Sequence, residues 1–200
     1  ALAEKLSNAK PAERVYLFLN ALEGISDKTK AQEYSQRLIE LLDEVPSEYR
    51  TSLTLRLARL WAKVGLLEKA VTLCDNLLEK DADEATRNET EFLKCALLEL
   101  EGRPEAEAGL LALSQRPDKN TRLKAFARLV NFYEARGNTE ESKAIFSREL
   151  MGLVDGSETL PPEAQSEVMS AGATLIKYLP EKEAARLSDW LEALQKTQTL

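Results

Sequence analysis

Residues that could carry out acid–base or nucleophilic chemistry are few in this sequence. It contains no histidine, so the commonest general base and metal ligand is missing. The two cysteines, Cys74 and Cys95, lack the C-x-x-C spacing of redox and zinc motifs. Because a free cysteine packs like a small hydrophobic residue, we expect two buried thiols, with a disulfide between them as the less favoured alternative.

Neighbouring carboxylates, such as Glu140 with Glu141 and Glu105 with Glu107, are the next possible catalytic groups. They lie where helices are expected to begin, and acidic side chains are stabilised there by the helix dipole, so we interpret them as solvated surface. Neither a glycine-rich phosphate loop nor a G-x-S-x-G motif is present. The sequence therefore predicts a protein that is not an enzyme, with no catalytic residue, cofactor or metal site.

The overall composition favours a helical protein. Of the 200 residues, 44% are hydrophobic and 30% charged, whereas glycine (8) and proline (7) are scarce, which excludes the disordered and collagen-like classes. The net charge of −7 disfavours nucleic acid as a partner. We find no apolar run long enough for a membrane span and no secretory signal, and the compartment stays open between cytoplasm and periplasm.

Hydrophobic periodicity predicts ten helices, and Leu53, Leu57, Leu60 and Val64 illustrate the recurring apolar stripe. The expected ranges are 11–24, 27–44, 47–65, 67–80, 84–101, 104–114, 119–136, 139–154, 162–178 and 181–196. Expected helix-ending glycines are Gly65, Gly102 and Gly137, and expected N-terminal caps are Asp27, Ser47 and Asp83. Short connections make consecutive helices antiparallel hairpins.

Two of these hairpins carry the same residue pattern. When Gly65 is aligned with Gly137, Trp61 falls on Tyr133, four residues before the glycine. A small residue lies five positions after each glycine, Ala70 in one hairpin and Ser142 in the other. The same register, extended along the chain, gives one small residue for each hairpin. These residues are Ala31, Ala70, Ala106, Ser142 and Ala184. Such residues let two helix backbones approach closely, while the bulky ones fill the space between hairpins.

This pattern, and the segment GLLEKA at 65–70 in particular, resembles the tetratricopeptide repeat (TPR) family, although these repeats are longer than the family's 34-residue unit. The resemblance implies an all-α, right-handed superhelix of about five helical hairpins; the alternative is an unrepeated helical bundle. We expect a single domain over residues 1–200. Residues 151–163 are a possible hinge before a C-terminal capping hairpin, or simply a long surface loop.

The resemblance also implies a binding scaffold, because the first helix of each hairpin in this family lines a concave groove that holds a protein or peptide. The residues expected to face the groove are Tyr16, Asn20, Ser52, Leu55, Arg59, Lys63, Glu91, Cys95, Lys124, Arg128, Asn131 and Glu134. We predict a mildly basic partner-binding strip, made of Arg56, Arg59, Lys63, Lys124, Arg128 and Asn131. The segment from Lys124 to Arg128 resembles half of the carboxylate clamp of some family members; the other half is not matched.

A second function remains open, in which the terminal helices assemble copies of the chain or join it to a larger complex. The last helix carries an apolar stripe, Leu187, Trp190, Leu191 and Leu194, that either closes the stack or docks on a neighbour. A homo-oligomer is therefore possible.

Overall fold

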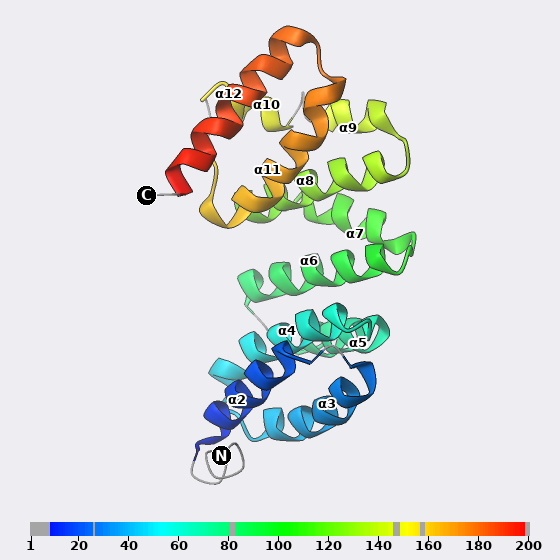
Figure 1. Cartoon of the computed structure of the whole chain (residues 1–200), viewed down its shortest axis with the longest axis vertical. Coiled ribbons are helices and arrows are strands. Elements are labelled where there is room, and N and C mark those ends of the chain that lie inside the picture. The colour runs from blue at the N-terminus through cyan, green and yellow to red at the C-terminus, as the bar shows by residue number, and fades with distance from the viewer. Residues whose placement is uncertain (1–8, 26, 81–82, 146–148, 157–158, 199–200) are drawn as a thin grey trace. The chain divides into compact units, whose positions relative to one another are not determined.

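The predicted amphipathic segments are helices in the computed structural model, which describes residues 9–25, 27–80, 83–145, 149–156 and 159–198 (Figure 1). No strand occurs within these ranges, and none of their helices is both long and apolar enough to cross a bilayer. The chain divides into two compact units, Ala1–Arg103 and Pro104–Leu200.

The first unit contains two helical hairpins and one further helix. Its helices are α2 (Pro11–Glu23), α3 (Lys28–Asp43), α4 (Ser47–Lys63), α5 (Leu67–Leu78) and α6 (Glu84–Leu100). Each helix packs on the next one in the chain, and α4 also packs on both α2 and α6. The first helices of successive hairpins are therefore neighbours, as expected for stacked repeats.

The second unit combines long helices with several short elements. They are α7 (Glu105–Leu113), α8 (Lys119–Ala135), α9 (Thr139–Ile145), α10 (Met151–Val154), η2 (Pro162–Ala164), α11 (Gln165–Leu175), η3 (Ile176–Tyr178) and α12 (Glu181–Gln198). The expected helix over 139–154 is described in parts: α9, the π-helical residues Glu149 and Leu150, and α10; residues 146–148 lie outside the described ranges. That the segment over 151–163 acts as a hinge stays a prediction.

Most of the predicted helix ends are confirmed. Gly65, Gly102 and Gly137 have φ values of 76°, 71° and 75°, a region that glycine enters without steric cost. The side chain of Asp27 accepts hydrogen bonds from two backbone N–H groups of α3, and Asp83 caps α6 in the same way. Ser47 is not a cap, because it is already the first residue of α4 and follows Pro46.

The predicted small residues lie where helices cross. Ala31, Ala70, Ala106 and Ser142 are all buried, and Ala184 is half-buried. The Ser142 hydroxyl also donates a hydrogen bond to the Val130 carbonyl of α8, at 3.0 Å. A larger side chain at these sites would push the paired backbones apart.

The aligned aromatic residues make equivalent hydrogen bonds in the two units. Trp61 of α4 donates from Nε1 to the hydroxyl of Ser35 on α3. Tyr133 of α8 donates from its hydroxyl to Glu107 on α7, at 2.9 Å. In both pairs the acceptor lies 26 residues before the donor. The sequence repeat is therefore also a repeat of contacts, each joining the first helix of a hairpin to the second helix of the preceding hairpin.

The apolar stripe of α12 faces, in part, the interior of its own unit. Leu187 and Leu191 are buried, and they lie against Gly172 of α11, where a Cβ atom would come within 3.2 Å of Leu191. Glycine at this position thus allows close packing of α11 and α12. These two leucines close the final hairpin, whereas Trp190 and Leu194 are half-buried.

Candidate functional site

The six residues predicted to bind a partner are divided between the two units. Arg56, Arg59 and Lys63 lie on α4, and Lys124, Arg128 and Asn131 lie on α8. Each group is therefore described within its own unit. A single binding strip made of all six residues stays a prediction.

Arg56 connects α4 to α2. Its guanidinium donates to Glu23 at 2.5 Å and to Asn20 at 2.7 Å, and it lies 4.8 Å from the centre of the Tyr16 ring. The hydrogen bond that Arg56 donates to Glu23 raises the pKa of Arg56 above its ordinary value, although desolvation opposes the shift. The charge of Arg56 is thus already compensated by partners within the chain.

The other basic residues of α4 differ from one another. Arg59 forms an ion pair with Glu89 of α6 at 2.6 Å, and both side chains are about half exposed. Lys63, near the end of α4, is exposed to solvent. Ion pairs of this exposed kind contribute little stability, so a partner could displace them at small cost.

On α8, polar residues connect to α11 and η3 in the same manner. The Asn131 amide donates to the Ser170 hydroxyl at 3.3 Å and accepts from the Thr174 hydroxyl at 3.0 Å. Glu134 accepts from Tyr178 and from Lys177, and the Tyr178 hydrogen bond is the main reason that the pKa of Glu134 is lowered. Lys124 and Arg128 are half-buried on the same helix.

An open apolar groove between α2 and α4 was not recognised as such from the sequence. Its volume is about 770 Å³, and its lining comes from the beginnings of both helices: Ala9, Ala12, Glu13, Tyr16, Leu17, Tyr49, Ser52 and Leu53. Tyr16 and Tyr49 are each 53% exposed, an unusual arrangement for two large aromatic side chains in one groove. Tyr16, Ser52, Leu55 and Cys95 were all expected to face the binding surface. Tyr16 and Ser52 line this groove, whereas Leu55 and Cys95 are buried.

The groove lies where α2 and α4 begin. Its lining from α2 runs from Ala9, just before that helix, to Leu17, and its lining from α4 runs from Tyr49 to Leu53. The first turns of the two helices therefore border the same hollow.

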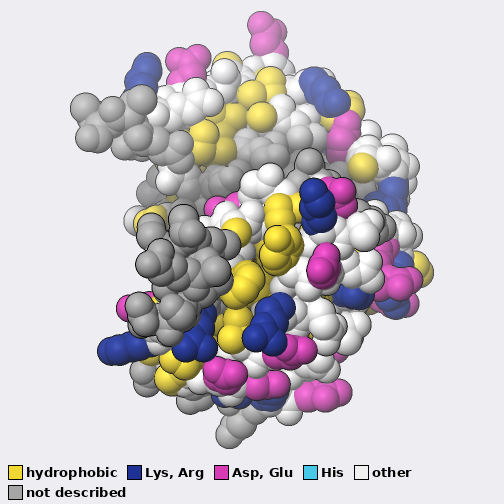
Figure 2. Space-filling view, turned by 60° about the horizontal axis from the view of Figure 1, so that its bottom comes forward, with side chains coloured by type: hydrophobic (Ala, Val, Ile, Leu, Met, Phe, Trp, Pro, Cys, Tyr) yellow, Lys and Arg dark blue, Asp and Glu magenta, His cyan; other side chains and the backbone are white. Residues whose placement is uncertain are grey.

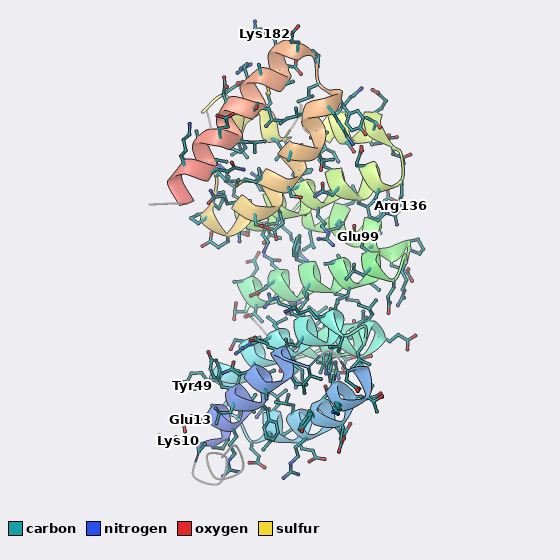
Figure 3. The ribbon with its side chains drawn as sticks, in the orientation of Figure 1. Lys10, Glu13, Tyr49, Glu99, Arg136 and Lys182 are labelled. Atoms are coloured by element: carbon teal, nitrogen blue, oxygen red, sulfur yellow. The ribbon has the colours of Figure 1, made fainter. Side chains whose placement is uncertain are left out.

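Charge is sparse among the residues that line the groove. Among the described residues that line the groove, Glu13 alone has a formal charge, and its carboxylate accepts a hydrogen bond from the backbone N–H of Lys10 at 3.0 Å. Figure 3 shows Lys10, Glu13 and Tyr49 together at this end of the first unit. Figure 2, with that end turned toward the viewer, shows hydrophobic side chains gathered between patches of both charge signs.

The two thiols have the character expected from the sequence. Cys74 and Cys95 are buried and free. Desolvation raises the pKa of Cys74 to about 12 and that of Cys95 to about 11, so neither is a reactive thiolate near neutral pH. Among the described residues, we find no group of three or more acidic or cysteine side chains placed to hold a metal ion.

Comparison with known proteins identifies the class of fold. No family model and no curated protein matches this sequence. Two crystal structures do match, both of nearly identical TPR-like repeats from a Podosopora anserina protein assigned as a kinesin light chain. The first has a TM-score of 0.55 at 19% identity, covering 96% of this chain and 99% of that one. The second has a TM-score of 0.54 at 18% identity, covering 94% and 97%.

The chain therefore has an all-α, TPR-like helical-repeat fold, which confirms the resemblance seen in the sequence. At this level of identity the likeness establishes the fold and leaves the partner to be argued from the surface.

Proposed function

We propose that this protein is an interaction scaffold that holds a peptide or a segment of a partner protein on the face formed by the first helices of its hairpins. The observation that carries the proposal is the groove between α2 and α4, where Tyr16 and Tyr49 are exposed beside Leu17 and Leu53. Large exposed apolar surface is costly in water, and tyrosine is enriched at protein interfaces. A partner that covers these side chains would recover that cost.

The polar residues of α4 and α8 have a secondary role in this proposal. Arg59 and Lys63 extend from the same helix that supplies Tyr49, so they could form the rim around an apolar contact. Lys124, Arg128 and Asn131 would act in the same way on the second unit. A rim of this kind adjusts specificity and association rate more than affinity.

Quantitative affinity capture from the native extract tests the proposal. The full chain is compared with a Tyr16→Ser/Tyr49→Ser variant and with a Tyr34→Ser control. Tyr34 lies on α3, is 41% exposed and does not line the groove, so the control removes an exposed tyrosine elsewhere on the same unit. We expect proteins captured by the wild type and the control to be lost from the groove variant, while its circular dichroism stays unchanged.

A capture profile that is identical for all three proteins would contradict a role for the groove. The competing function, assembly through the terminal helices, predicts a molar mass that rises with concentration in light scattering. Substituting Trp190, which is half-buried on α12, would then reduce that mass, whereas the groove variant would leave it unchanged.

A further inference from the structure

We infer that residues 149–156, which contain α10, form a strap on α12 that opens while the rest of the second unit stays folded. We further infer that the ion pair between Asp155 and Arg186 holds this strap closed. The inference is independent of the groove in the first unit. Three properties of the strap support it: its short helix, its few buried side chains and its exposed ion pair.

The helix of the strap has little stability of its own. Helix α10 is a single turn of four residues, whereas isolated helices shorter than about 12 residues are marginal in water. The Asp155 N–H donates to the Met151 carbonyl at 3.0 Å, and the Gly156 N–H donates to the Leu153 carbonyl at 3.2 Å. Both hydrogen bonds lie within the strap. Contacts with its surroundings must therefore keep the strap in place.

Few side chains provide those contacts. Helix α10 packs on α12, and the two buried residues of the strap are Leu150 and Leu153, each 2% exposed. Helix α11, in contrast, packs along α8 and buries a longer stripe, made of Val168, Ala171, Gly172 and Leu175. Because opening the strap exposes much less apolar surface than unfolding the unit, it should cost less free energy.

The ion pair is a contact that the solvent can reach. The side chains of Asp155 and Arg186 are 43% and 44% exposed, so the pair contributes little to the stability of the whole unit. It nevertheless joins the strap directly to α12. Dissolved ions, or a charged partner, weaken an exposed pair far more than they weaken the packing of buried leucines. The opening of the strap should therefore respond to charge.

Thiol labelling of the full chain compares the strap with the interior of its unit. Leu153→Cys introduces a thiol under the strap, and Leu175→Cys introduces one at a buried leucine of α11 as the matched control. Peptide mass mapping separates both from the native Cys74 and Cys95. We expect the thiol of Leu153→Cys to react at least about tenfold faster, because sub-global opening precedes unfolding.

A charge variant tests the role of the ion pair. Arg186→Gln should accelerate labelling of Leu153→Cys by about two- to fivefold, the size of one exposed pair, and leave Leu175→Cys unchanged. Lys182→Gln is the matched control, since Lys182 is an exposed cation on the same helix (Figure 3). Raising sodium chloride from about 20 mM to about 300 mM should also accelerate labelling of Leu153→Cys, but not in the Arg186→Gln background.

Because Leu153→Cys removes one of the two buried side chains, hydrogen exchange of the unmodified chain supplies a second measurement. The Asp155 and Gly156 amides should exchange faster than those in the middle of α11, and faster again in Arg186→Gln. Equal rates at the strap and in α11, by labelling or by exchange, would overturn the inference, since both would then open together. Equal acceleration of Leu153→Cys and Leu175→Cys by Arg186→Gln would also overturn it, because the pair would then stabilise the whole unit.

Discussion

The buried hydrogen bond from Trp61 to Ser35 provides the sharpest test of how the hairpins are held together. Trp61 is 3% exposed and Ser35 is 1% exposed, so water cannot replace either partner. The perturbation is a double-mutant cycle with Ser35→Ala, Trp61→Phe and the combination of both. Each single substitution removes the hydrogen bond, and the combined variant shows what the bond itself contributes.

The expected magnitudes follow from burial. Ser35→Ala leaves the Trp61 N–H buried without an acceptor, which costs about 2 kcal/mol of unfolding free energy. Trp61→Phe costs more, because it also opens a cavity between α3 and α4. The double variant should be less destabilised than the sum of the single variants by about 1 kcal/mol, because no unpaired N–H remains.

Urea unfolding followed by far-ultraviolet circular dichroism measures these free energies, with an unchanged m value as the control for two-state comparison. Hydrogen exchange should locate the loss of protection in α3 and α4. The equivalent pair in the second unit supplies an internal comparison. Tyr133→Phe should cost only about 0.5–1 kcal/mol, because its acceptor Glu107 is half-buried and can be hydrated.

Additive effects of Ser35→Ala and Trp61→Phe, within about 0.3 kcal/mol, would refute the reasoning, since uncoupled residues behave in that way. A larger loss from Tyr133→Phe than from Ser35→Ala would also refute it. Burial would then not determine the strength of the contact.

Four further predictions concern turns, crossings, caps and thiols. Gly65→Ala should cost about 1–2 kcal/mol in urea unfolding, because φ is 76° there although the added methyl meets no atom within 4 Å. Ala70→Leu should cost about 1–3 kcal/mol in the same assay, because its site is fully buried where α5 crosses α4. Backbone hydrogen bonds lower the pKa of Asp27, so the stability it contributes is present above its unfolded pKa of 3.8 and lost on further acidification; Asp27→Asn should flatten this part of the pH–stability curve. Burial raises the pKa values of Cys74 and Cys95, so their contribution to stability is complete below pH 9 and falls as pH rises toward 11 and 12; a thiol reagent should label them at pH 8 only as fast as the unit opens.

The sequence was sufficient to predict the features that depend on local rules. Helix positions followed from apolar periodicity, and the positive φ at Gly65 and Gly137 followed from their place after each stripe. The crossing residues Ala70 and Ser142 were found because steric limits at a helix crossing admit only small side chains. One local prediction was wrong. Ser47 was expected to be the N-terminal cap, but Pro46 occupies the cap position and Ser47 is the first residue of α4.

The candidate site was harder to predict, because it depends on pairs of residues far apart in the chain. Arg56 and Arg59 were assigned to a mildly basic partner-binding strip, and nothing in the local sequence reveals that Glu23 and Glu89 lie within reach of them. The groove depends on how the beginnings of α2 and α4 lie beside each other, which a prediction of each helix by itself does not give. Tyr49 could have attracted attention as an aromatic residue in the first turn of a helix, facing no predicted partner.

The exposure of Tyr16 and Tyr49 has a consequence for engineering. Each side chain is 53% exposed at the beginning of its helix, while buried residues such as Val15, Leu19, Leu55 and Leu57 hold the two helices in place. Exchanging only these two aromatic residues should therefore change what the hollow accepts and leave the fold intact. A small library at the two positions would be a direct way to select a new occupant.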